Sequence, residues 1–283
     1  MTGPVGHLVQ TGWLAEHLED LDLVILDASW HMPAEHRDAK AEHVQGHIPG
    51  AVFFDIDAVA DHATDLPHML PEPQAFATAA RRLGVEPGSL IVVYDVVGVM
   101  SAPRVWWSFR AMGHDQVFVL DGGLKKWVAE GHPVETGWRE PPHGEFKAHL
   151  RPELVADLVA VRAAVASRAP QLVDARAAAR FTGEAPEPRA DLRRGHMPGA
   201  RNAPWASLVT PDGTLARPPQ LKAAFEAAGV DLTGPVITTC GSGITAALLA
   251  LALAELGRED VAVYAGSWTE WGGRPDTPVA TGP

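Results

Sequence analysis

The sequence is poor in cysteine and in positive charge. It has one cysteine among 283 residues, which excludes an internal disulfide, and a free thiol is typical of a reducing compartment. Lysine and arginine number 23 against 35 aspartate and glutamate residues, giving a formal net charge of −12. This balance argues against nucleic acid or an anionic membrane surface as a partner. It does not exclude a small anionic substrate, because a few local cations can hold one in a cleft.

Long apolar runs and metal-ligand clusters are also missing. No stretch of about twenty apolar residues occurs, so no membrane span is predicted. The N-terminal residues Met1 to His7 have neither the basic nor the apolar part of a signal peptide, so a cytoplasmic protein is expected. One cysteine and scattered histidines do not make a metal site, and no metal or cofactor is predicted. At 283 residues the chain is long enough for two domains, and a hydrophobic content of 46% is enough to form their cores.

The one cysteine, Cys240, lies in a stretch that favours reactivity. The β-branched run Val236 to Thr239 predicts a buried strand, and the Ala/Leu-rich run from Ala246 to Leu256 predicts a helix. Between them, the sequence Cys-Gly-Ser-Gly allows the backbone to curl around the sulfur with several N–H groups pointing inward. A helix N-terminus adds its positive dipole end, which favours a thiolate nucleophile. The alternative is that Cys240 is a small buried hydrophobic residue.

The chain repeats itself once. Gly-His-Ile-Pro-Gly-Ala at residues 46–51 returns as Gly-His-Met-Pro-Gly-Ala at residues 195–200. Other landmarks recur in the same order, 144 to 149 residues apart. In this register Cys240 corresponds to Asp95, and Gly243 corresponds to Gly98. The sequence therefore predicts a tandem duplication in which only the second half can perform thiol chemistry.

Strand and helix patterns alternate in each half. We expect strands at residues 23–27, 52–54, 90–95, 117–120 and 236–239, and helices at residues 73–83, 102–112, 123–127, 154–166 and 246–256. The alternation predicts an α/β fold in which each half forms a parallel sheet flanked by helices. Ligands bind such sheets at the carboxyl ends of their strands, which is where Cys240 is expected. We predict domains at residues 1–135 and 154–283, joined by a Pro- and Gly-rich linker at residues 136–153.

These motifs resemble the two-domain rhodanese superfamily of sulfurtransferases. The resemblance rests on the duplicated Gly-His-Ile/Met-Pro-Gly-Ala motif and on a cysteine present only in the second half, with Asp95 at the corresponding place in the first. The loop Cys-Gly-Ser-Gly-Ile-Thr at residues 240–245 is similar to the Cys-Gly-Ser-Gly-Val-Thr loop of 3-mercaptopyruvate sulfurtransferases. The resemblance implies transfer of sulfur through a Cys240 persulfide, with release of pyruvate. The acceptor would be a thiol, a thioredoxin-like protein or cyanide.

The resemblance also implies a proton relay. Ser242 matches the serine of the active loop, and the stretches Asp-Ile-Asp at residues 55–57 and His-Met-Leu-Pro at residues 68–71 match first-domain motifs of the family. Asp57 is expected to orient His68, which polarises Ser242. The alternative is that Asp57 is a turn residue and His68 an ordinary loop residue.

Two arginines are implied as substrate ligands. Arg180 and Arg189 lie in Ala-Arg-Phe-Thr-Gly-Glu-Ala-Pro-Glu-Pro-Arg, which resembles the family's substrate-binding segment, although Ala179 replaces a frequent glycine. A guanidinium can hold a carboxylate in a two-pronged fork. The remaining loop residues expected at the substrate are Gly241, Gly243, Ile244 and Thr245.

Several neighbouring polar residues are expected to be structural. His47 and His196 occur in both halves and are predicted to hold loop backbone, and Asp27 and Asp174 are predicted to bond backbone N–H groups after their strands. Arg176, Arg193 and Arg194 are predicted to be solvated or weakly paired.

Three other functions would use parts of this pattern. A thiosulfate sulfurtransferase would share the fold and the persulfide, but such enzymes usually carry basic residues directly after the cysteine, where this chain has Gly241 and Ser242. A cysteine-dependent phosphatase needs an arginine six residues after the cysteine, and position 246 is alanine. A non-catalytic binding module usually lacks the cysteine.

Overall fold

A computed structural model describes residue 4 and residues 6–283 of the chain. Residues 1–3 and 5, part of the stretch on which the signal-peptide prediction rests, lie outside the described residues. Tertiary contacts divide the chain into two compact units. Unit 1 comprises Met1–Ala60, Pro71–Arg151 and Pro211–Leu215, and unit 2 comprises Asp61–Leu70, Pro152–Thr210 and Ala216–Pro283. Each unit thus includes a short segment from the other half of the sequence. The boundaries given above for the domains and linker stay a prediction.

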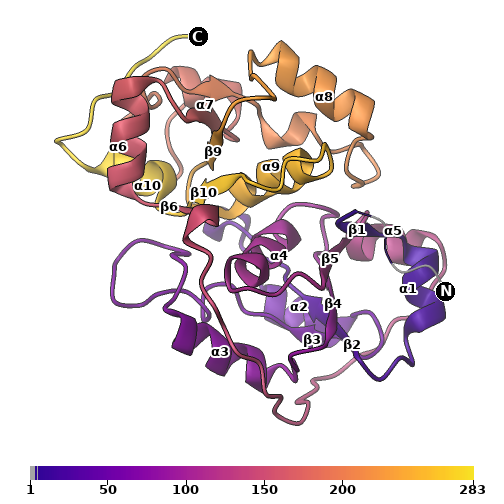
Figure 1. The fold of residues 1–283 in the computed structure, drawn as a ribbon. Helices are drawn as coiled ribbons and strands as arrows, with labels where there is room; N and C mark the ends of the chain where they lie inside the picture. The colour runs from indigo at the N-terminus through magenta and orange to yellow at the C-terminus, as the bar shows by residue number, and fades with distance from the viewer. Residues whose placement is uncertain (1–3, 5) are drawn as a thin grey trace. The chain divides into compact units, whose positions relative to one another are not determined.

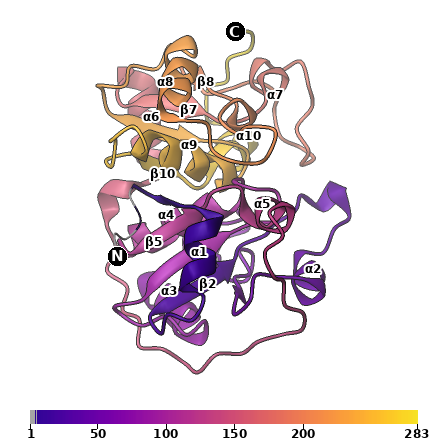
Figure 2. The same ribbon diagram turned by 90° about the vertical axis from the view of Figure 1, so that its right-hand side faces the viewer.

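Unit 1 contains a five-stranded sheet in the order β1-β5-β4-β2-β3, with every pair parallel. The strands are β1 (Leu8–Val9), β2 (Leu23–Asp27), β3 (Val52–Phe53), β4 (Leu90–Tyr94) and β5 (Val117–Leu120). The helices are α1 (Thr11–His17), α2 (Ala39–Gln45), α3 (Pro73–Arg82), α4 (Ala102–Ala111) and α5 (Gly123–Ala129), with a 3-10 turn η1 (Pro33–Glu35). Helix α4 contacts β4 and β5, and α1 contacts α5 (Figures 1 and 2).

Unit 2 contains a second sheet with the equivalent order, β6-β10-β9-β7-β8, again parallel throughout. Its strands are β6 (Val155–Ala156), β7 (Gln171–Asp174), β8 (Arg201–Asn202), β9 (Val236–Thr239) and β10 (Ala262–Tyr264). The helices are α6 (Leu158–Ser167), α7 (Ala178–Thr182), α8 (Pro218–Ala227), α9 (Ile244–Ala254) and α10 (Ser267–Gly273), with 3-10 turns η2 (Pro152–Leu154) and η3 (Trp205–Ser207). The α/β class and the parallel sheets are as predicted.

The start of unit 2 differs from the prediction. Residues 154–166 were expected to form one helix, but Val155–Ala156 form an edge strand paired with β10, and α6 begins only at Leu158. The carboxylate of Asp157 caps α6 by accepting the N–H of Ala160 at 2.8 Å. A two-residue strand carries no periodic pattern, so its pairing is decided by a partner strand about a hundred residues later in the chain.

Helix α9 follows the Cys240 loop and is buried almost completely. Ten of its eleven residues are buried, the exception being Thr245, and it contacts β9 and β10. A helix that is apolar on nearly every side belongs in a core, and burial of these Ala and Leu side chains fixes its N-terminus against the end of β9. The helix begins at Ile244, four residues after Cys240, so its packing also fixes the position of the loop between them.

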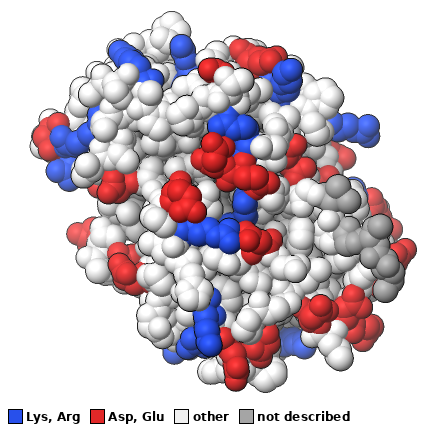
Figure 3. All heavy atoms as spheres, in the orientation of Figure 1, with Lys and Arg blue, Asp and Glu red and all other residues white. Residues whose placement is uncertain are grey.

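No helix in the described part of the chain is long and apolar enough to cross a membrane. Among the residues described on the face drawn in Figure 3, acidic and basic side chains are interspersed, with no broad basic area.

Candidate active site

The loop after β9 places Cys240 at the carboxyl end of a central strand. The cysteine is 2% exposed, and its sulfur accepts the backbone N–H of Gly243 at 3.1 Å. Gly243 has φ +86°, a left-handed conformation that glycine adopts without strain, and this conformation leads the chain from the peptide beside the sulfur into α9. A backbone N–H directed at a sulfur stabilises the thiolate form.

The start of α10 fixes the other side of this loop. The carbonyl of Cys240 accepts the N–H of Trp268 at 3.0 Å, and that of Gly241 accepts the N–H of Thr269 at 2.9 Å and its hydroxyl at 2.7 Å. Ser267 is fully buried, accepts the Cys240 N–H at 3.1 Å and lies 3.9 Å from the sulfur. Its φ of +49° is unusual for a residue with a side chain and marks a constrained position. Sequence reasoning missed Ser267 and Thr269, because their repeat counterparts gave no chemical signal.

His68 belongs to unit 2 together with the cysteine loop. It is 3% exposed, has φ +57°, and its Nδ1 lies 3.1 Å from the main-chain oxygen of Ser242. A carbonyl only accepts hydrogen bonds, so Nδ1 carries the hydrogen in this contact. Ser242 itself is 6% exposed. The structure brings His68 and Ser242 together through the main-chain oxygen of the serine.

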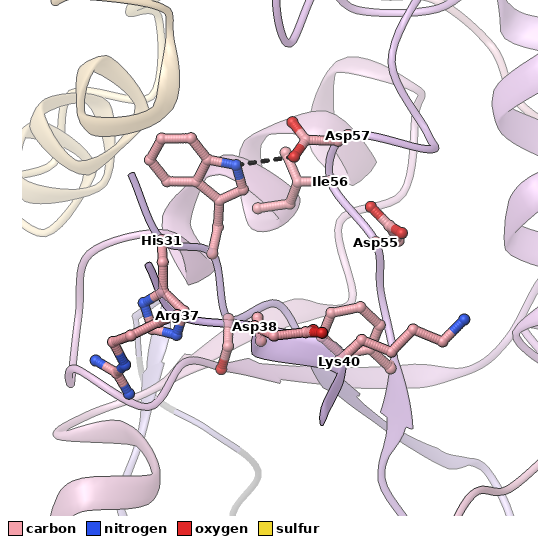
Figure 4. Close-up of a pocket in the computed structure, with 11 residues that line it drawn as sticks. His31, Arg37, Asp38, Lys40, Asp55, Ile56 and Asp57 are labelled. Carbon is pink, nitrogen blue, oxygen red and sulfur yellow. Dashed lines mark hydrogen bonds between the residues drawn. The ribbon is translucent and has the colours of Figure 1, made fainter. Parts of the chain in front are cut away.

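Asp57 belongs to unit 1. Its carboxylate accepts the indole N–H of Trp30 at 3.1 Å, the bond drawn as a dashed line in Figure 4. Both residues line a pocket of about 350 Å³, together with the cations Arg37 and Lys40 and the acids Asp38 and Asp55. The role of Asp57 toward His68 stays a prediction.

Arg180 lies against the cysteine loop. A Cβ added to Gly241 would come within 3.0 Å of Nη2 of Arg180, so the absence of a side chain at position 241 leaves the space that the guanidinium occupies. Arg180 is paired with Glu187, whose carboxylate accepts Nη2 at 2.5 Å and Nε at 3.3 Å. Arg189 is half-buried on the same segment. Ile244 is buried and Thr245 half-buried in the first turn of α9.

Arg176 is not the solvated residue that was predicted. Its side chain is 1% exposed, and its guanidinium bonds Asp174, Glu187 and the carbonyl of Gly195. Burial acts to lower the pKa of Arg176, but the charges and hydrogen bonds of Asp174 and Glu187 outweigh it and raise that pKa above its ordinary value. The sequence shows the charge of an arginine but not its partners. Arg193 likewise donates to the carbonyls of Trp271, Gly272 and Thr277, so the prediction of a solvated residue was wrong for it too.

The structural predictions for Asp27 and Asp174 are confirmed. Asp27 accepts the N–H of Ser29 and Asp174 accepts that of Arg176, both in the loop after the strand. The Nδ1 atoms of His47 and His196 bond the backbone carbonyls of His43 and Phe181, but these residues lie in helices α2 and α7 and not in loops as predicted. Within the described residues, no group of three or more His, Cys, Asp or Glu side chains is arranged to hold a metal ion.

The loop after β4 repeats the cysteine loop with a carboxylate in place of the sulfur. Asp95 is fully buried and its two oxygens accept five backbone N–H groups at 2.8 to 2.9 Å. The donors are Val97, Gly98, Met100, Ser101 and Ala102. Both loops therefore direct backbone N–H groups at the side chain that follows the strand, a carboxylate oxygen in one and the sulfur of Cys240 in the other.

Comparison with known proteins identifies the family. The model of the rhodanese-like domain matches the chain twice, at residues 10–130 and 158–274. The chain belongs to the rhodanese family. It is 47% identical to the 3-mercaptopyruvate sulfurtransferase of Escherichia coli K12 over 96% of both chains. It is also 44% identical to the thiosulfate sulfurtransferase of Bos taurus, over 97% of this chain and 95% of the other. The solved structure of SseA from Escherichia coli, a 3-mercaptopyruvate sulfotransferase, superposes with a TM-score of 0.86 at 45% identity, covering 93% of this chain and 99% of the other.

Proposed function

We propose that this rhodanese-family chain is a sulfurtransferase that takes sulfur from 3-mercaptopyruvate. The Cys240 thiolate attacks the donor sulfur, and the carbon–sulfur bond breaks with its electron pair left on the carbon. The resulting pyruvate enolate takes up one proton and leaves, and the sulfur stays on Cys240 as a persulfide. An acceptor then removes the outer sulfur, so the two half-reactions on one cysteine predict ping-pong kinetics.

The observation that carries the proposal is the close approach of the Arg180 guanidinium to Gly241. Overall identity does not separate the two donors, because relatives named for 3-mercaptopyruvate and for thiosulfate are 47% and 44% identical to this chain. The loop supports mercaptopyruvate as the donor. Gly241 leaves room for the guanidinium of Arg180, and a planar guanidinium suits the planar carboxylate of mercaptopyruvate.

We also propose a proton relay at this site. The donor thiol must lose a proton and the enolate must gain one. His68 and the hydroxyl of Ser242 are the groups proposed to move it, with Asp57 as the proposed orienting carboxylate. Arg180 and Arg189 are proposed to bind the donor carboxylate, and Gly241, Gly243, Ile244 and Thr245 to provide the loop backbone around the sulfur.

The acceptor is proposed to be a thiol, a thioredoxin-like protein or cyanide. A reducing compartment such as the cytoplasm is proposed because Cys240 must stay a free thiol to accept sulfur.

Steady-state kinetics with both donors test the proposed function. We expect wild type to prefer mercaptopyruvate. The substitution Ser242→Ala should lower kcat with mercaptopyruvate about a hundredfold, and with thiosulfate only slightly because thiosulfate brings no thiol proton. A preference of wild type for thiosulfate would contradict the choice of donor, and equal losses with both donors would contradict the relay.

Mass spectrometry separates an enzyme from a binding module. After treatment with mercaptopyruvate, the mass of wild type should increase by one sulfur atom, and that of Cys240→Ser should not. No added sulfur with either donor would favour a non-catalytic rhodanese-like module.

A further inference from the structure

Glu187 is a buried carboxylate that the proposed chemistry does not use. Its side chain is 1% exposed, yet it lies between two arginines. One oxygen accepts Nη1 of Arg176 at 2.8 Å and the other accepts Nη2 of Arg180 at 2.5 Å. A buried carboxylate is costly unless it is paired, so this double pairing accounts for its burial.

The inner end of this cluster is rigid. Arg176 is held by both oxygens of Asp174 at 2.7 to 3.1 Å and by the carbonyl of Gly195 at 2.9 Å, and it stacks over Trp268 at 4.4 Å. These contacts fix the position of the Arg176 side chain. Through Arg176, Glu187 is therefore fixed to the end of β7.

The outer end of the cluster reaches the cysteine loop. Arg180 is the most exposed member, with 22% of its side chain accessible, and its Nη2 lies close to Gly241, the residue after the nucleophile. Glu187 bonds the Nε and Nη2 edge of the guanidinium. Among the described residues nothing bonds Nη1, so the opposite edge is available to an anion.

We infer that Glu187 is a positioning residue, which holds the guanidinium of Arg180 at Gly241 so that its other edge meets the carboxylate of the sulfur donor. The inference rests on the proposed function, since it assigns Arg180 a ligand. The four charges alternate along the cluster, Asp174, Arg176, Glu187 and Arg180, and sum to zero. Glu187 thus lowers the net positive charge of this cluster and fixes the orientation of Arg180, the member of the cluster that lies near Gly241.

Removal of the charge of Glu187 has two opposing effects. The uncompensated Arg180 attracts anions more strongly, but water screens this effect at a partly exposed side chain. Arg180 also regains its rotamers, and each anion that binds must then order a long side chain again. We expect the loss of order in Arg180 to prevail, so that anionic reagents react more slowly with Cys240 than they do in wild type.

Alkylation of Cys240 tests the inference without sulfur transfer. Iodoacetate carries a carboxylate and iodoacetamide is its neutral analogue, and the single cysteine makes the labelled position unambiguous. The ratio of their rate constants, followed by mass spectrometry, reports how well the site receives an anion. For Glu187→Gln we expect this ratio to fall about five- to tenfold, with the iodoacetamide rate unchanged. The KM for mercaptopyruvate should rise by a similar factor, with kcat within about twofold.

A double-mutant cycle shows whether Glu187 acts through Arg180. In an Arg180→Ala background, Glu187→Gln should change the alkylation ratio by less than about twofold. The matched control is Asp260→Asn, which removes an arginine-paired carboxylate of the same unit, bonded to Arg258, and should leave the ratio unchanged. Glu187→Asp keeps the charge on a shorter stem and should lower the ratio only about two- to threefold, and it serves if Glu187→Gln does not fold.

Three outcomes overturn the inference: an unchanged ratio in both Glu187 variants, an effect of Glu187→Gln that persists without Arg180, or an unchanged ratio in Arg180→Ala. Failure of the proposed function has a different signature. In that case mercaptopyruvate transfers no sulfur to wild type, while the alkylation ratios still follow the predicted pattern.

Discussion

At the scale of single residues, the reactivity of Cys240 depends on the backbone of Gly243. The N–H of Gly243 lies 3.1 Å from the sulfur, and the φ of +86° at Gly243 lets the chain turn from this peptide into α9. A residue with a Cβ costs about 1 kcal/mol in this conformation and tends to rotate the peptide away from it. The geometry of the loop therefore controls how far the thiolate is stabilised.

The substitution Gly243→Ala tests this dependence. We expect it to lower the rate of Cys240 alkylation by iodoacetamide at pH 7 about tenfold, because the N–H no longer stabilises the thiolate. The matched control is Gly257→Ala, where φ is +82° and an added Cβ meets nothing within 4 Å. Both variants carry the same backbone strain, so similar loss of stability but unequal alkylation is expected. Equal alkylation rates would show that the Gly243 bond does not matter for the thiolate.

At the scale of elements, the turn from β4 to α4 depends on one buried anion. Asp95 accepts five N–H groups, including that of Ala102 at the start of α4. In Asp95→Asn the amide has one acceptor oxygen and turns a donor toward other donors, which leaves buried N–H groups unpaired.

We expect Asp95→Asn to lower the free energy of unfolding by about 3 kcal/mol, measured by urea denaturation. The control is Asp22→Asn, an exposed residue of the same unit, which should change stability by less than about 0.5 kcal/mol. A loss for Asp95→Asn as small as that of the control would mean that ordinary turn contacts hold this loop.

A second buried carboxylate, Asp121, follows strand β5. Asp121 accepts the N–H of Leu215 at 2.8 Å and the side-chain amide of Gln10 at 3.2 Å. Burial nevertheless dominates and raises the pKa of Asp121. A carboxyl whose folded pKa exceeds its unfolded pKa stabilises the fold when protonated, and that contribution is lost as the pH rises through the folded pKa.

The substitution Asp121→Asn should remove this pH dependence. Its oxygen can still accept the Leu215 N–H, and Gln10 can turn its carbonyl toward the new amide. The stability of the variant relative to wild type should therefore increase from about pH 4 to pH 7. Urea unfolding of both proteins at several pH values measures the difference. A relative stability that falls with rising pH would mean that the bonds of Leu215 and Gln10 outweigh burial.

At the scale of the whole molecule, each unit uses a segment from the other half of the chain. Residues 61–70, with His68, belong to unit 2, and residues 211–215, with Leu215, belong to unit 1. In unit 1, residues 211–215 supply the N–H of Leu215, which Asp121 accepts, and the carbonyl of Pro211, which accepts a hydrogen bond from Lys125. A simple division of the chain therefore leaves both units incomplete.

Fragments test this exchange. Residues 152–283 expressed alone lack the His68 segment and should unfold at least about 5 °C below the unit-2 transition of the intact chain. The matched control joins residues 61–70 to this fragment through a Gly/Ser linker and should recover part of the difference. Fragment 152–283 with the full Tm, measured by circular dichroism, would contradict the contribution of the segment.

Much of the fold follows from local sequence. Strands β2, β4, β5 and β9 were predicted to within one residue, because short apolar β-branched runs between turn residues have few alternatives. The short strand β6 was missed, since two residues carry no pattern and only the partner β10 makes them a strand. The start of α9 came two residues earlier than predicted, at Ile244, where the left-handed Gly243 precedes the first helical turn.

The sequence by itself determined the α/β class and the one position where a thiol is present, because these depend on local pattern and on one unrepeated cysteine. Tertiary structure decided the partners of the charges. Arg176, Glu187 and Arg180 are ordinary charged residues in the sequence, and their burial and mutual pairing arise only when β7, α7 and the following loop pack together. Tertiary structure also decided that His68 meets the backbone of Ser242. These residues are 174 positions apart, and such a contact depends on packing that no local pattern encodes.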